Sequence, residues 1–91
     1  MFEIKYKTEE EQLAAVRQDG NKIQYIYNPT EMIQLEAVKQ NGRAIQFIHN
    51  PEPSVIRYVI ENHNDLEIIQ SMRINFDELP DDLKLLLEIK F

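Results

Sequence analysis

A seventeen-residue stretch occurs twice in this chain of 91 residues, and the repetition constrains the fold more strongly than any other feature. Leu13–Pro29 and Leu35–Pro51 are identical at ten positions and similar at three more. Unrelated segments of that length would match at about one position. The offset of 22 residues is typical of stacked repeats, in which one unit cannot cover its own apolar face and must pack against neighbours. The chain should therefore fold by stacking similar units.

Each unit carries signals for a helix, a sharp corner and a second, shorter helix. Asn28 followed by Pro29, with Glu31 three residues after the asparagine, predicts a helix with Asn28 as its N-cap. The helix should end at Gly42, in the left-handed conformation that glycine adopts most easily. A shorter helical element is expected from Arg43 to His49. The apolar face of the first helix is made of Met32, Ile33, Leu35, Ala37 and Val38.

Weaker copies of the unit flank the two clear ones. Asn50-Pro51 opens a third unit with a helix expected over Pro53–Asn62, and Asn64 replaces the glycine. Pro80 opens a fourth helix, and Thr8 starts a capping box for the first. The sequence therefore predicts one all-α domain over residues 1–91, an α-solenoid of about four helix–turn–short-helix repeats: 8–27, 28–49, 50–72 and 79–91.

Two short segments do not fit the repeat. Phe2–Tyr6 alternates apolar and polar residues, as a strand does, and Arg73–Phe76 could pair with it to form a small β cap. The alternative is that neither segment is a strand. Leu87–Phe91 has a similar pattern but is expected to finish the fourth helix.

The unit NPxxxxQLxAVxQNGxAIxxI, from Asn28 to Ile48, resembles a family of helical repeats of unknown function found in phage and bacterial proteins. More distantly, it is similar to the leucine-rich repeat variant, in which an α-helix alternates with a 3₁₀ helix. The resemblance covers roughly residues 8–70 and is strongest over Leu13–Pro51. It implies a right-handed helical stack and a phage origin, and it brings no catalytic residues.

The composition predicts a small soluble protein. The chain contains no cysteine, so a disulfide framework and a thiolate metal site are both excluded. Residues 1–7 lack the apolar core of a signal peptide, and no apolar run is long enough to span a membrane. We therefore expect a cytoplasmic protein, located in the host cytoplasm if a phage encodes it.

The negative charge is concentrated in the last third of the chain. Of the net charge of −6, residues 61–91 contribute −5, from eight acidic and three basic side chains. An acidic balance argues against nucleic-acid binding, which needs cations to displace counterions from phosphates, and favours a protein partner with a basic surface. The expected contact surface is an acidic end made of Asp65, Glu67, Asp77, Glu78, Asp81 and Asp82.

The residues that usually carry chemistry lack the spacing that chemistry needs. His49 and His63 are fourteen residues apart, with no ligand motif around either. Both glycines are used at helix corners, so no phosphate-binding loop is available, and Ser54 lacks a nucleophile elbow. The sequence therefore predicts a protein that is not an enzyme and that needs no metal or cofactor.

Three other sets of residues are alternative contact candidates, each with a structural explanation as well. Basic side chains could form a ridge for phosphate, but cations in a last helical turn also stabilise the helix dipole. Repeated amides could form a polar stripe for a partner, or they could bond to the backbone of the turns. Tyrosines at polar repeat positions could be exposed contact residues, which are common at interfaces, or they could be partly buried. These sets are Arg17, Lys22, Lys39 and Arg43; Gln18 and Gln40; and Tyr27 and Tyr58.

We therefore expect a non-enzymatic protein-binding module. If a phage encodes it, a counter-defence role of the anti-CRISPR kind fits, in which carboxylates of the acidic end take the place of phosphates and block a host nucleic-acid-handling complex. Two alternatives stay open. One is a nucleic-acid-associated regulator that uses the basic ridge, and the other is an assembly subunit that forms a homodimer.

Overall fold

The computed structural model describes residues 5–63 and 65–91, and in this part of the chain every regular element is a helix. The prediction of an all-α fold is confirmed. Five α-helices and three 3₁₀ helices, labelled η, follow one another in the order α1 (Glu9–Gln18), η1 (Gly20–Tyr25), α2 (Glu31–Gln40), η2 (Gly42–Phe47), α3 (Pro53–Asn62), α4 (Leu66–Ser71), η3 (Phe76–Glu78) and α5 (Asp81–Lys90).

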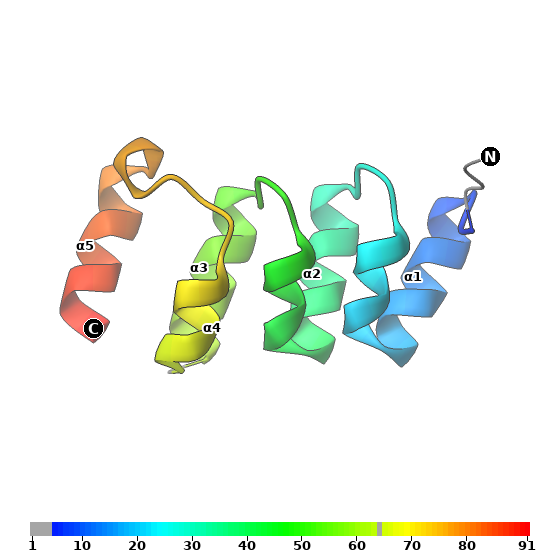
Figure 1. Cartoon of the computed structure of the whole chain (residues 1–91), viewed down its shortest axis with the longest axis horizontal. Coiled ribbons are helices and arrows are strands. Elements are labelled where there is room, and N and C mark those ends of the chain that lie inside the picture. The colour runs from blue at the N-terminus through cyan, green and yellow to red at the C-terminus, as the bar shows by residue number, and fades with distance from the viewer. Residues whose placement is uncertain (1–4, 64) are drawn as a thin grey trace.

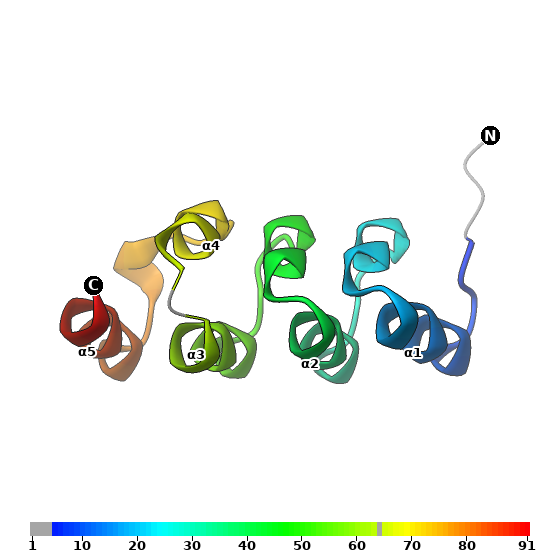
Figure 2. The same cartoon turned by 90° about the horizontal axis from the view of Figure 1, so that it is seen from below.

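The helices form two parallel rows. Helices α1, α2, α3 and α5 lie side by side in one row, and η1, η2 and α4 lie in the second (Figures 1 and 2). All four helices of the first row run from the upper to the lower edge of Figure 1, and the second row returns the chain upward. The longest extent of the molecule is 42 Å, which suits four neighbouring helices about 8–10 Å apart.

Equivalent apolar positions of successive units form one continuous core between the rows. Val16, Val38 and Ile60 follow at intervals of 22 residues, and all three are completely buried. Ile23 and Ile45 repeat in the same way in the second row. Each such side chain stabilises the fold by about 1.5–3 kcal/mol through burial. The sequence repeats because one packing solution is used several times.

The helix starts differ in part from those that the sequence predicts. The predicted N-cap Asn28 is wrong: α2 begins at Glu31, and its cap is Thr30, whose Oγ1 accepts a hydrogen bond from the Ile33 amide at 3.3 Å. Asn28 and Asn50 instead have positive φ angles, 51° and 71°. Asparagine tolerates this conformation better than most residues, so each Asn-Pro pair reverses the chain between a 3₁₀ helix and the next α-helix.

Other predicted starts are confirmed. Thr8 caps α1, since its Oγ1 accepts a hydrogen bond from the Glu11 amide at 3.1 Å. Helix α3 begins at Pro53 and ends at Asn62, as expected, and α5 continues through Lys90.

The role predicted for glycine at the corners is also wrong, because no glycine has a positive φ. Asp19 and Asn41 end α1 and α2 in extended conformations, and their side chains cap η1 and η2. Glycine is required by close packing instead. A Cβ atom on Gly20 would lie 2.3 Å from the carbonyl oxygen of Ala37 in the next unit. Asn64, predicted in the equivalent place, is outside the described residues.

The predicted β cap is not seen. Of Phe2–Tyr6, the first three residues lie outside the described part of the chain. Arg73–Phe76 is not a strand, because Arg73 donates from Nε to the Gln46 carbonyl oxygen at 2.8 Å and Asn75 caps η3 through the Asp77 amide. These bonds hold the segment against η2 and start a new helical turn.

Candidate functional site

The six residues of the predicted acidic end do not form one surface. Asp65 and Glu67 lie at the start of α4, on the lower edge of the molecule, and the other four lie on η3 and the first turn of α5, on the upper edge (Figure 1). Helix α4 separates the two groups by carrying the chain from one edge to the other. In the lower group, Arg43 Nη2 is 3.5 Å from Asp65 Oδ2 and 3.9 Å from Glu67 Oε2, so its charge is partly neutralised.

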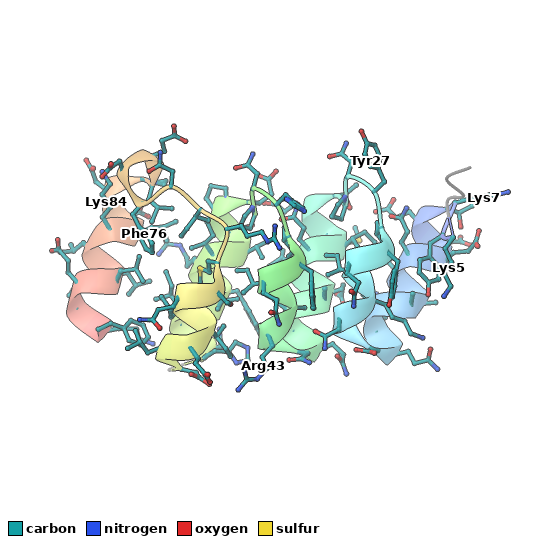
Figure 3. The ribbon with its side chains drawn as sticks, viewed as in Figure 1. Lys5, Lys7, Tyr27, Arg43, Phe76 and Lys84 are labelled. Carbon is teal, nitrogen blue, oxygen red and sulfur yellow. The ribbon has the colours of Figure 1, made fainter. Side chains whose placement is uncertain are left out.

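The upper group, which we call the acidic cap, consists of Asp77, Glu78, Asp81 and Asp82. All four side chains are exposed. Asp82 forms an ion pair with Arg57 of α3, whereas the other three form no ion pair within residues 5–63 and 65–91. The acidic cap therefore presents three available carboxylates at the C-terminal end, where Figure 3 also places Phe76 and Lys84.

Two of the four cations in the predicted basic ridge, Arg17 and Arg43, are paired with carboxylates. Arg17 Nε is 3.4 Å from Glu36 Oε2, and Arg43 contacts the acidic residues of α4. Lys22 Nζ donates to Gln18 Oε1 at 2.8 Å, and Lys39 is exposed. Exposed pairs of this kind contribute at most about 1 kcal/mol to stability. They leave Lys22 and Lys39 as the ridge cations without an ion pair in the described residues.

Two of the repeated glutamines bond to the backbone of a neighbouring unit. Gln34 is only 5% exposed, and it donates from Nε2 to the Pro29 carbonyl oxygen and accepts at Oε1 from the Glu52 amide, both at 3.0 Å. Gln40 Oε1 accepts from the Gly20 amide at 2.6 Å. Gln34 and Gln40 therefore hold successive units together, whereas Gln18 only accepts a hydrogen bond from Lys22.

A groove with a volume of about 820 Å³ is lined by residues of η1, of η2 and of the loops that follow these two helices. Its exposed aromatic side chains are Tyr25, 54% exposed, and Tyr27, 79% exposed. Figure 3 shows Tyr27 at the upper edge. Phe47 and His49 occupy the same positions one unit later. We call this feature the aromatic groove, and its polar lining residues are Lys5, Gln24, Asn28, Gln34, Asn50, Glu52 and Arg73.

The aromatic groove has a local excess of positive charge in an acidic protein. Lys5 Nζ lies 5.3 Å from the centroid of the Tyr25 ring, a cation–π distance. Arg73, an exposed side chain held by the Gln46 carbonyl oxygen, also lines the groove. Glu52 is the one carboxylate among the described lining residues. Aromatic surface and cations together suit a ligand with apolar and acidic groups.

Of the predicted tyrosines, only Tyr27 lies in the groove. Tyr58 is half-buried, and its ring meets that of His63 edge-on, with centroids 6.2 Å apart. It is therefore mainly a packing residue. The groove itself was missed, although the aromatic pair Tyr25 and Phe47 at matching repeat positions is a signal that could have indicated it.

Helix α5 and the residue after it expose both apolar and acidic side chains. The exposed apolar residues are Leu85 and Ile89 of α5 and Phe91 after it, and the exposed acidic residues of α5 are Asp81, Asp82 and Glu88. Exposed apolar side chains at this end of the stack correspond to the assembly alternative.

The two histidines have different surroundings. His49 lies in the groove wall, and His63 packs against Gly42. No group of three or more His, Cys, Asp or Glu residues in the described part of the chain is placed to hold a metal ion. None of the helices in residues 5–63 and 65–91 is long and apolar enough to cross a membrane.

No protein-family model, curated protein or solved structure matches this chain. The resemblance of the repeat unit to phage and bacterial helical repeats therefore stays a prediction.

Proposed function

We propose that this protein is a short right-handed α-solenoid that works as a non-enzymatic protein-binding module, and that it holds an extended segment of a partner in the aromatic groove. The solenoid architecture is supported by the two rows of helices and by the alternation of α-helices and 3₁₀ helices in the first two units. Seen along the rows from the N-terminal end, the chain turns clockwise as it advances, which supports a right-handed path (Figures 1 and 2).

The observation that carries the binding proposal is the exposure of Tyr25 and Tyr27 beside a groove of about 820 Å³. Tyrosine offers a large apolar ring and a hydroxyl at low entropic cost, and it is enriched among residues that dominate binding energy. The volume lies within the range of ordinary ligand sites, about 300–1,000 Å³. Solenoids use such surfaces, which run across successive units, to bind other chains.

Selection from a random-peptide library tests this proposal. The wild-type protein should enrich a family of peptides, and the Tyr25→Ala/Tyr27→Ala variant should bind them at least about tenfold more weakly, because the aromatic contact area is lost. Leu66→Ala is the matched control, since Leu66 is also an exposed apolar side chain but lies outside the groove. Equal enrichment by the wild type and the double variant would remove the proposal.

A second candidate function rests on the acidic cap. The available carboxylates of Asp77, Glu78 and Asp81 lie together on one edge, as a surface that competes with phosphates would require. We propose this cap as the contact surface for the counter-defence role, with a basic protein as the partner. Asp65 and Glu67 are left out, because they lie on the opposite edge beside Arg43.

Neutralising the acidic cap should weaken binding to a basic ligand. The probe is a short lysine–glycine peptide, titrated at low salt with the wild type and with Asp77→Asn/Glu78→Gln/Asp81→Asn. The variant should bind about fivefold more weakly, since each exposed charge pair contributes a few tenths of a kcal/mol. Asp65→Asn/Glu67→Gln is the control and should bind like the wild type. An equal loss in both variants would show that only total charge matters.

A further inference from the structure

We infer that the segment bound in the aromatic groove is a polyproline II helix that runs along the stack of units and carries acidic residues at its ends. This inference rests on the proposed peptide-binding function and names the chemistry of the partner. It is drawn from three features of the groove: the spacing of its aromatic positions, the nature of its surface, and its charges.

The spacing of the units matches the pitch of polyproline II. Tyr25 and Phe47 are equivalent positions in adjacent units, as are Tyr27 and His49. Helices that pack side by side are about 8–10 Å apart, so equivalent positions recur at about that distance along the stack. A polyproline II helix rises 3.1 Å per residue with three residues per turn, or about 9 Å per turn. Every third residue of such a ligand therefore meets an equivalent aromatic position.

The surface of the groove suits this ligand. Proline-rich segments dock into aromatic-lined grooves, because the proline rings of the ligand pack against tyrosine side chains and the ligand is already extended before it binds. A polyproline II backbone makes no internal hydrogen bonds, so its carbonyl oxygens can accept bonds from groups such as the Gln24 amide and the tyrosine hydroxyls. Gln24 Nε2 donates one hydrogen to the Asn21 carbonyl oxygen at 3.0 Å, so its second hydrogen and the tyrosine hydroxyls are donors that line the groove.

The charges of the groove favour acidic flanks. Lys5 lies beside Tyr25, in the first unit, and Arg73 is held by Gln46 of the second unit. The two cations therefore belong to opposite ends of the groove, with Glu52 as the single described carboxylate in the lining. An extended ligand along the stack would bring one end close to each cation. Carboxylates at both ends should strengthen binding, and more so at low salt.

The test uses synthetic peptides in which two glutamates flank several Pro-Pro-Ala triplets on each side. The first comparison peptide has every proline replaced by glycine, and the second has every glutamate replaced by lysine. Calorimetric titration of the full chain should show that the Pro-Pro-Ala peptide with glutamate flanks binds. The affinity should be at least tenfold lower for the peptide without proline and several-fold lower for the peptide with lysine flanks. Binding should fall at least tenfold in Tyr25→Ala/Tyr27→Ala and stay unchanged in Leu66→Ala.

The outcomes separate this inference from the proposed function. The polyproline assignment would be overturned if the proline peptide did not bind, or if it bound the double variant as strongly as the wild type. If library selection then gave peptides without proline that still needed Tyr25 and Tyr27, the peptide-binding function would stand with a different ligand. If no peptide depended on these tyrosines, both proposals would fail. The double variant should fold normally, because both side chains are exposed, and far-UV circular dichroism checks this.

Discussion

Replacing Gly20 with alanine should lower the free energy of unfolding by about 3 kcal/mol. The new Cβ would lie 2.3 Å from the carbonyl oxygen of Ala37, and a backbone atom within a helix cannot move aside without shifting the whole unit. The shift would also strain the short bond from the Gly20 amide to Gln40. Urea unfolding followed by far-UV circular dichroism would measure the loss.

Gly42→Ala is the matched control, because Gly42 occupies the same position one unit later. There the nearest atoms belong to the imidazole ring of His63, about 2.7 Å from the added Cβ, and a side chain can turn away. We expect a loss of about 1 kcal/mol, most of which His63→Ala in the same chain should restore. A Gly20 variant as stable as the Gly42 variant would contradict the close backbone approach of the first two units.

Gln34→Leu should destabilise the fold by about 2 kcal/mol. Leucine has nearly the volume of glutamine, so the change removes hydrogen bonds without opening a cavity. The Pro29 carbonyl oxygen and the Glu52 amide would each lose a partner in a partly buried place, and unpaired polar groups that are shielded from water cost about 1–3 kcal/mol. Thermal or urea unfolding would measure the effect.

Gln12→Leu is the matched control, because Gln12 occupies the position of Gln34 one unit earlier and is less buried. Gln12 is half-buried and makes one longer bond, 3.3 Å from Nε2 to the Tyr6 carbonyl oxygen, so a loss of about 0.5 kcal/mol is expected. If the two variants were equally stable, the bonds of Gln34 would not hold adjacent units together.

The fold could be predicted from the sequence largely because it repeats. Apolar periodicity and proline positions placed α3 at its observed bounds and a short helix after Gly42. The roles of Asn28 and Gly20 were not predictable, because the same residue types serve as caps, as left-handed turns and at close contacts. Only the position of the neighbouring unit decides between these roles, and Ala37 of that unit is what requires glycine.

The candidate site was harder to predict than the fold. Its parts come from Lys5, the turns after η1 and η2, and Arg73, and only the stacking of units brings them together. The acidic residues show the opposite effect: they are close in sequence, but α4 places Asp65 on one edge and the acidic cap on the other. Of the predicted contact residues, Tyr27 alone lines the groove, and its side chain is exposed.

The most direct test of the central claim is an NMR titration of the isotope-labelled protein with a library-selected peptide, read from the backbone amide shifts. Binding in the aromatic groove predicts that the shifts gather on residues 24–28 and 47–50, with further changes at Lys5 and Arg73. Shifts that gather on residues 77–82 or on the outer face of α5 would contradict the groove as the binding surface.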